Sequence, residues 1–201
     1  MTFITFEGGD GAGKTTQVNL LAAALRKLGH TVEVTREPGG TPIAERIRDL
    51  VLSIENLGLD RHAEALLYAA SRAEHVAKKV RPALEAGHIV ICDRYIDSSV
   101  AYQGVGRRLG RDEVLNLNLW ATGGLVPDLT VLLDVEHNSG LARVSDPNRI
   151  EAEPAEFHGK VRQAFLDLAA ADPDRYLVLP AHDSRESIAA SVLAAAIEVI
   201  G

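Results

Sequence analysis

Cysteine is nearly absent from this chain, since Cys92 is the single one. An intramolecular disulfide is therefore excluded, which fits a reducing compartment. No apolar run approaches the roughly 20 residues of a membrane span. The chain also opens directly on a strand-like segment, without the basic region and cleavage site of a signal peptide. We therefore expect a soluble, cytoplasmic protein.

An excess of positive charge is missing too. The chain has 21 basic and 28 acidic side chains, which gives a net charge of −7. Proteins that bind nucleic acid usually show the opposite sign or a basic stripe, so we expect no nucleic-acid partner. The arginines are scattered instead, a pattern that suits small phosphorylated ligands.

Several functional motifs are absent as well. No Asn-Lys-x-Asp element of the GTPases occurs, and nothing resembles the His-Arg-Asp catalytic loop of protein kinases. No spacing of cysteines and histidines suggests a zinc site. These absences leave nucleotide chemistry open while excluding its commonest signalling forms.

Hydrophobic residues make up 46% of the 201 residues, enough for the core of one domain spanning residues 1–201. Strand-like runs lie at Thr2–Phe6, Thr31–Thr35, His88–Cys92, Leu129–Val135 and Tyr176–Leu179. Helical patterns lie at Lys14–Leu28, Thr41–Ser53, Arg61–Glu85, Arg111–Thr122, Pro154–Ala170 and from Arg185 to Val199, the last after a capping pair of Asp183 and Glu186. This alternation predicts an α/β fold with a parallel sheet covered by helices on both faces.

A glycine-rich loop follows the first strand and opens the first helix. It reads Gly8-Gly9-Asp10-Gly11-Ala12-Gly13-Lys14-Thr15, the G-x-x-x-x-G-K-T pattern of a phosphate-binding loop. Backbone N–H groups and the helix N-terminus would cradle phosphates, Lys14 would reach the β- and γ-phosphates, and the Thr15 hydroxyl would coordinate Mg²⁺. The alternative, a plain glycine turn, does not explain the lysine and the threonine.

Two further motifs end strands at the predicted ligand crevice. Asp93 and Arg94 follow the third strand, where Asp93 would serve the metal or orient the acceptor and Arg94 would bind a phosphate; a surface ion pair is the alternative. Arg36 ends the second strand before a rigid Pro-Gly-Gly turn and would point inward, unless this is an ordinary strand-to-helix turn.

Side chains suited to a nucleobase come later in the chain. Tyr68 and Arg72 share one helix face at i, i+4, where a ring could stack on a base and a guanidinium could bond its edge. Gln103 offers both a donor and an acceptor. A core tyrosine and a surface arginine are the alternatives for the first two.

A polar segment around Ser145 to Asn148 predicts a short lid at about 142–153. Arg143 and Arg149 flank it, and mobile arginines of this kind stabilise a transferring phosphoryl group. Two solvated arginines beside a loop are the alternative.

In this order, the motifs resemble those of the bacterial thymidylate kinases. The matching pieces are Phe6 through Thr16, Thr35 through Gly40, Leu66 through His75, Asp93 through Ser99, Ala101 through Gly104 and Asn148 through Glu151. The resemblance covers nearly the whole chain. It implies a P-loop NTPase-type fold with a five-stranded sheet and a helical lid, a homodimer, and phosphorylation of dTMP to dTDP by ATP and Mg²⁺ for dTTP synthesis.

The resemblance also implies residue roles. ATP would be bound by residues 8–15 with Thr16 and Arg143, and Mg²⁺ by Thr15 and Asp93. The dTMP site would comprise Asp10, Arg36, Arg48, Tyr68, Arg72, Arg94, Ser99, Tyr102 and Gln103. In these roles, the phosphate would meet the arginines at 36, 48 and 94, while Asp10 and Tyr102 would contact the sugar.

Two departures from the family pattern matter. Tyr68 stands where a phenylalanine is common, so its hydroxyl needs a partner. The phosphate-binding loop contains no arginine, so Arg149, with Arg143 as the weaker candidate, would complete the catalytic set of Lys14, Asp93 and Arg94. Other nucleoside monophosphate or deoxynucleoside kinases, and a nucleotide-switched interaction module, remain as alternatives.

Overall fold

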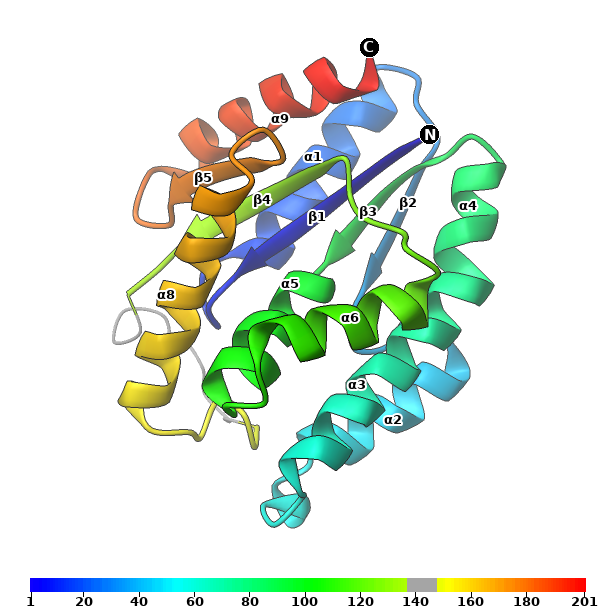
Figure 1. Cartoon of the computed structure of the whole chain (residues 1–201). Coiled ribbons are helices and arrows are strands. Elements are labelled where there is room, and N and C mark those ends of the chain that lie inside the picture. The colour runs from blue at the N-terminus through cyan, green and yellow to red at the C-terminus, as the bar shows by residue number, and fades with distance from the viewer. Residues whose placement is uncertain (137–147) are drawn as a thin grey trace.

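The structure, a computed structural model, describes residues 1–136 and 148–201. Its strands are β1 (Thr2–Gly8), β2 (Val32–Arg36), β3 (Ile89–Asp93), β4 (Leu129–Asp134) and β5 (Tyr176–Pro180). Its α-helices are α1 (Lys14–Lys27), α2 (Pro42–Leu52), α3 (Arg61–His75), α4 (Arg81–Glu85), α5 (Ile96–Ser99), α6 (Arg111–Thr122), α8 (Ala155–Ala171) and α9 (Arg185–Ile200) (Figure 1). A 3₁₀ turn, η1 (Ile54–Asn56), and two π-helical segments, η2 (Val76–Val80) and η3 (Val100–Gly106), connect them.

The five strands form one parallel sheet in the order β2-β3-β1-β4-β5. β1 is central, so the loop that follows it emerges between the ends of β3 and β4. In this register Arg36 of β2 stands beside Asp93 of β3. The carboxyl ends of the strands therefore bring the three polar motifs of the sequence to one edge, where ligands bind in open α/β sheets.

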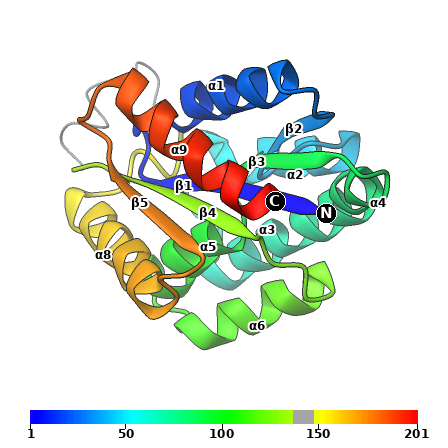
Figure 2. The same cartoon turned by 90° about the horizontal axis from the view of Figure 1, so that it is seen from above.

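Helices cover both faces of the sheet (Figure 2). Ile4 and Phe6 point to the face under α1 and α9, where Leu25 and Val192 belong to the same buried cluster. Phe3 points to the opposite face, into a cluster with the segments from η2 to α5. Successive β1 residues thus alternate between two apolar layers, as a doubly buried parallel strand requires. The predicted fold class is confirmed.

The local predictions differ from the structure at a few boundaries. The expected helix Arg61–Glu85 is α3, η2 and α4 in succession. α9 is capped by Ser184, whose hydroxyl accepts from the Ser187 N–H, so the predicted capping pair of Asp183 and Glu186 is wrong. Ser184 lies one residue closer to the first helical residue, the position from which a side-chain oxygen reaches a free N–H of the first turn.

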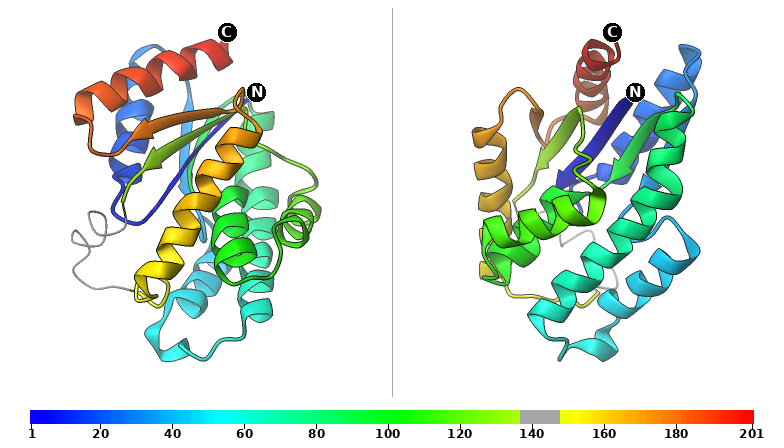
Figure 3. Two further views of the ribbon diagram at one scale, coloured as in Figure 1. Left: turned by 60° about the vertical axis from the view of Figure 1, so that its left-hand side comes forward. Right: turned by 45° about the vertical axis from the view of Figure 1, so that its right-hand side comes forward.

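α2 and α3 extend side by side beyond the strand ends and form one wall over the carboxyl edge of the sheet (Figure 3). The first half of the predicted lid, residues 142–147 with Arg143, lies outside the described residues; the part from 148 onward is described and leads to α8. None of the helices in the described part of the chain combines the length and apolarity needed to cross a membrane.

Candidate functional site

The loop between β1 and α1 depends on two glycines with positive φ. Gly8 has a φ of 131°, and a Cβ there would lie 2.3 Å from the carbonyl oxygen of Leu133. Gly13 caps α1 in the left-handed region with a φ of 91°. Only glycine adopts both conformations without a steric cost, so the close approach of β4 and the direction of the helix N-terminus both follow from these two residues.

Lys14 begins α1 and is buried. Its ammonium donates to the carbonyl oxygens of Gly8 at 3.1 Å and Gly9 at 2.8 Å, so the side chain folds back over the loop. Burial, together with the nearby Arg94 guanidinium, lowers the pKa of Lys14 to about 8. An anion bound on the loop would raise this pKa again, because an opposite charge favours the charged form.

A threonine and a carboxylate meet where β3 ends beside α1. The Thr15 hydroxyl donates to an Asp93 carboxylate oxygen at 2.7 Å. A hydroxyl and a carboxylate oxygen are ligands that Mg²⁺ prefers, with water and phosphate oxygens completing its octahedron. These two residues therefore fit the predicted metal site. Thr16, next in α1, is exposed in the first turn.

Arg94 connects the phosphate-binding loop to α5. Its backbone has a φ of 72°, rare for a side chain of this size. Its guanidinium donates to the carbonyl oxygen of Gly8 at 3.0 Å, to Ser98 Oγ at 3.1 Å and to Asp10 Oδ1 at 2.5 Å. Burial lowers the pKa of Arg94, but Tyr102 and Asp10 outweigh it and hold the pKa well above its usual value. The arginine stays cationic in a protein interior.

Asp10 is shared between this arginine and a buried tyrosine. The Tyr102 hydroxyl donates to its Oδ2 at 3.1 Å. Burial raises the pKa of Asp10, whereas Arg94 and Lys14 lower it by more, so the net shift is downward. The result is an ionised carboxylate beside a fixed cation and a hydroxyl, a set that binds the polar end of a sugar phosphate.

Glu7 is buried behind Arg94 and contacts it indirectly, through Ser98. Its carboxylate accepts from the Tyr95 N–H at 2.7 Å, the Ser98 N–H at 3.3 Å and the Ser98 hydroxyl at 2.6 Å. Burial, with the charge of Asp97 second, raises the pKa of Glu7 to about 7. Because Ser98 also contacts Arg94, this buried carboxylate links the end of β1 to the arginine of the site.

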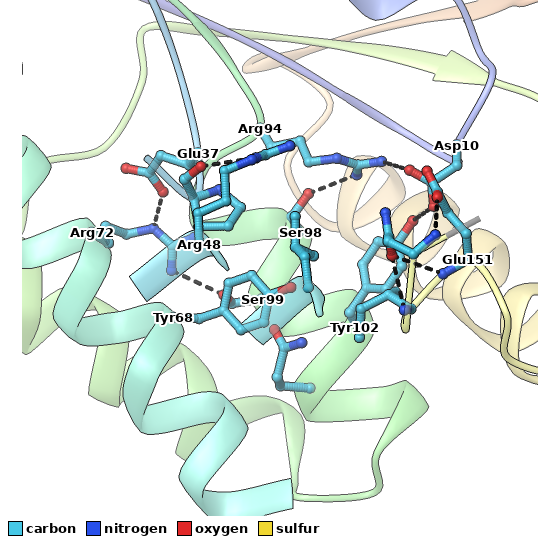
Figure 4. A pocket seen from close by; sticks show the side chains of 15 residues that line it. Asp10, Glu37, Arg48, Tyr68, Arg72, Arg94, Ser98, Ser99, Tyr102 and Glu151 are labelled. Carbon is cyan, nitrogen blue, oxygen red and sulfur yellow. Dashed lines mark hydrogen bonds and ion pairs between the residues drawn. The ribbon is translucent and has the colours of Figure 1, made fainter. Parts of the chain in front are cut away.

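One pocket extends from this cluster toward α3 (Figure 4). It is lined by Asp10, Glu37, Pro38, Arg48, Leu52, Tyr68, Arg72, Arg94, Ser98, Ser99, Tyr102, Gln103, Asn148, Ile150 and Glu151. Arg94 and Asp10 lie at one end, and Arg72 with Glu37 at the other. The structure thus brings together all but one of the residues predicted for the second substrate.

The exception is Arg36. Its side chain is half exposed and pairs with Glu45 of α2 at 2.8 Å. It lines a separate hollow with Thr15 and Asp93, so the prediction that it points into the Arg94 pocket does not match the structure. Glu45, in the first turn of α2, binds the guanidinium of Arg36 and so holds it outside the pocket. Arg48 of α2 does line the pocket, donating to the Pro38 carbonyl oxygen at 2.9 Å.

Arg72 is not the surface cation of the alternative interpretation, since it is 2% exposed. Its Nε donates to Glu37 at 2.6 Å, its Nη2 to the Tyr95 carbonyl oxygen at 3.0 Å, and its Nη1 to Ser99 Oγ at 3.0 Å and to Asn118. A guanidinium has five N–H donors. Four are engaged, so its direction is fixed by protein contacts.

Glu37 also holds His75, at 2.8 Å, and the sequence spacing did not indicate this contact. Glu37, His75 and Cys92 place potential metal ligands within 4.8 Å of one another. However, Arg72 and His75 occupy the two Glu37 oxygens, and Thr35 contacts the second His75 nitrogen at 2.7 Å. The cluster is a packed hydrogen-bond network behind Arg72.

Arg149 is held by α2 and α3 in this conformation. It is 3% exposed, its Nη1 pairs with Glu64 at 2.7 Å, and its Nε donates to the Val51 carbonyl oxygen at 3.0 Å. The predicted role at the transferring phosphoryl group would require it to leave both partners. Leaving them is costly, because it would strand the buried carboxylate of Glu64 without this cation. Arg143, the other predicted lid arginine, lies outside the described residues.

Glu64 is the main residue of the site that the sequence analysis missed. It is 0% exposed and also accepts from Gln103 Nε2 at 2.9 Å. One signal for it exists in the sequence: Glu64, Tyr68 and Arg72 follow at steps of four and share one helix face. Asn118 of α6, by contrast, reaches Arg72 from 46 positions away and carries no local signal.

Comparison with known proteins bears on this geometry. A family model described as thymidylate kinase matches residues 6–192. The chain is 55% identical to the thymidylate kinase of Clavibacter sepedonicus, over 96% of this chain and 93% of that protein. It is 52% identical to the thymidylate kinase of Deinococcus radiodurans, over 98% of this chain and 96% of that protein. The crystal structure of the Ehrlichia chaffeensis thymidylate kinase, which is 37% identical in sequence, superimposes on this structure with a TM-score of 0.79. The superposition covers 96% of this chain and 97% of that one.

Proposed function

This chain belongs to the thymidylate kinase family of nucleoside monophosphate kinases, and we propose that it transfers the γ-phosphoryl group of ATP to dTMP with Mg²⁺. The observation that carries the proposal is Arg94, whose guanidinium donates to the Gly8 carbonyl oxygen of the phosphate-binding loop and which also lines the adjoining pocket. One cation thereby borders the donor site and a second anion site. A nucleotide-switched interaction module would not need a second anion site.

On the donor side, the N–H groups of residues 8–15 and the start of α1 bind the triphosphate. Lys14 turns from the Gly8 and Gly9 carbonyl oxygens to the phosphates, where it neutralises charge. Thr15 and Asp93 would hold Mg²⁺, which would supply charge neutralisation at the phosphates. Gly13, at the helix cap, keeps the N-terminus open to the phosphate.

On the acceptor side, Arg94 and Arg48 bind the dTMP phosphate, and Asp10 accepts the sugar 3′-hydroxyl. Tyr102 packs against the sugar, where its hydroxyl bond to Asp10 leaves little room for a 2′-hydroxyl. In the base pocket, the Tyr68 ring stacks on thymine, and Arg72, Ser99 and Gln103 read its edge. These roles are supported by the shared pocket and by the family resemblance.

The transfer is in line and needs no covalent intermediate. Lys14 and Arg94 lie on either side of the transferring group and stabilise its charge, while positioning supplies most of the remaining catalysis. Arg149 joins them only if lid closure releases it from Glu64. Asn148, Ile150 and Glu151, which line the pocket, would then help to exclude water from the reaction.

A coupled kinase assay tests the proposal, with ATP and Mg²⁺ as donor and dTMP, dUMP and UMP as acceptors. Efficient turnover of dTMP, with dUMP weaker and UMP weakest, is the expected result. Preference for another monophosphate would identify a different nucleoside monophosphate kinase. ATP hydrolysis that no acceptor changes would indicate the switch module instead.

We also propose a homodimer, active in the cytoplasm in the supply of dTTP. Its support is an exposed apolar surface on α3 and α6, where Leu66 is 58% and Trp120 83% exposed. Burying such side chains between two copies stabilises association. Sedimentation of the wild type and of Trp120→Glu tests this, since the substitution should yield monomers. A wild-type monomer at micromolar concentration would refute it.

A further inference from the structure

The strongest unassigned feature is the buried carboxylate of Glu64, which joins three separate segments. It accepts from Gln103 Nε2 at 2.9 Å, from Arg149 Nη1 at 2.7 Å, and from Arg107 Nε at 3.2 and 3.3 Å. Arg107 continues to Glu153 at 2.6 Å. Both carboxylate oxygens of Glu64 are therefore occupied by donors from η3, from the segment just after it, and from the chain after residue 147.

These contacts determine how the Gln103 amide is oriented. A side-chain amide has an NH₂ donor at one end and an oxygen acceptor at the other, and an ionised carboxylate only accepts. The NH₂ group must therefore face Glu64. Gln103 lines the pocket, and across residues 1–136 and 148–201 no hydrogen bond occupies its Oε1. The amide thus offers the pocket an acceptor.

Arg72 offers the pocket a hydrogen-bond donor, whereas Gln103 offers an acceptor. Four of its five N–H donors are engaged by Glu37, Ser99, Asn118 and the Tyr95 carbonyl oxygen, so one remains, and the guanidinium cannot accept. The pocket accordingly presents a donor from α3 and an acceptor from η3. A base edge with a ring N–H beside a carbonyl, as in thymine, is complementary to this pair. Cytosine carries a ring acceptor beside an amino donor and opposes both.

We propose that Glu64 is a positioning residue for acceptor selectivity, which holds the Gln103 oxygen toward the ring N–H of thymine and so rejects aminopyrimidines. This inference rests on the proposed function, because it assumes that a pyrimidine monophosphate occupies the pocket. Glu64 itself touches no substrate. It acts through the direction of the neighbouring amide, and a mismatched base would leave buried polar groups unpaired.

The test compares kcat/KM for dTMP and dCMP in the full-length wild type, Glu64→Gln and Ser71→Ala. In Glu64→Gln the new amide can turn either end toward Gln103, so the Gln103 amide can flip, and the ratio of the two values should fall by roughly tenfold or more. Ser71→Ala is the matched control on the same helix. Its hydroxyl is buried and has no partner among the described residues, so the ratio should not change.

A purely structural role would lower both activities together and leave the ratio unchanged, and that result would overturn the proposal. Glu64→Gln leaves the buried Arg149 without its carboxylate and Arg107 with Glu153 alone. A swapped variant, Glu64→Gln with Gln103→Glu, therefore keeps the charge count. Position 103 then still presents an acceptor, so selectivity should return, whereas Gln103→Leu should lose it. Equal selectivity in these two variants would also overturn the proposal.

Failure of the inference is distinguishable from failure of the proposed function. If the wild type does not phosphorylate dTMP, the proposed function fails before any variant is compared. If the wild type prefers dTMP and Glu64→Gln keeps that preference, only the role of Glu64 is rejected.

Discussion

The donor and acceptor halves of the site are built in opposite ways. The donor half is built around one continuous stretch, residues 8–15, to which β3 adds only Asp93, and its contacts are largely made by backbone groups and by Lys14. The acceptor half gathers side chains from α2, α3, η3 and the chain after residue 147, held by buried ion pairs such as Arg72–Glu37. A local structure can bind any triphosphate, whereas selectivity depends on groups that are fixed from several directions. Substitutions in the two halves should therefore differ in kind.

The largest effect is expected in the donor half, from Lys14→Ala. Removing the cation at the phosphates should lower kcat by at least about 100-fold with every acceptor, because its contribution is to charge stabilisation in transfer. Lys27→Ala, in the exposed last turn of the same helix, is the control. Steady-state kinetics with dTMP and dUMP measure this. Near-normal activity of Lys14→Ala would sink the proposed function.

In the acceptor half, Arg72→Lys should be selective. Lysine keeps the charge but lacks the planar fork that bonds Glu37, Ser99 and the Tyr95 carbonyl oxygen. We expect kcat/KM for dTMP to fall by about 30- to 100-fold, or roughly 2–3 kcal/mol, while KM for ATP stays within twofold. Arg46→Lys on the exposed face of α2 is the control. An equal loss toward ATP would show that the two halves are not separable.

Arg149→Met separates a structural from a catalytic arginine. Because the guanidinium is buried against Glu64, its loss should lower the free energy of unfolding by about 3 kcal/mol. We expect kcat of the folded variant at low temperature to fall less than about tenfold. Urea unfolding and kinetics on the same preparation check both values. Unchanged stability with a 100-fold lower kcat would restore the predicted catalytic role.

The smallest effect concerns the junction of the two halves at Glu7. Its pKa is raised from 4.5 to about 7, so the native state binds more protons than the unfolded state between those values. Stability should therefore decrease as the pH rises from about 4.5 to 7, by on the order of 2 kcal/mol. Glu7→Gln should remove this slope in urea unfolding measured at pH 5.5 and 7.5. An identical slope in the variant would show that another group titrates.

The sequence alone determined the features that depend on local contacts. The glycines of residues 8–15 and the apolar runs of the strands follow from backbone conformation and burial, so the loop, the order of elements and the fold class were predictable. Asp93 and Arg94 were predictable for the same reason, since carboxyl ends of parallel strands converge at one edge.

Only the tertiary structure decided which partner each buried charge selects. Arg149 pairs with Glu64 across 85 positions and Arg72 with Glu37 across 35, while Arg36 turns to Glu45. Nothing in the spacing of these residues indicates such pairs. A buried charge takes the opposite charge that packing brings within reach, and this is settled when α2, α3 and the chain after residue 147 come together over the sheet.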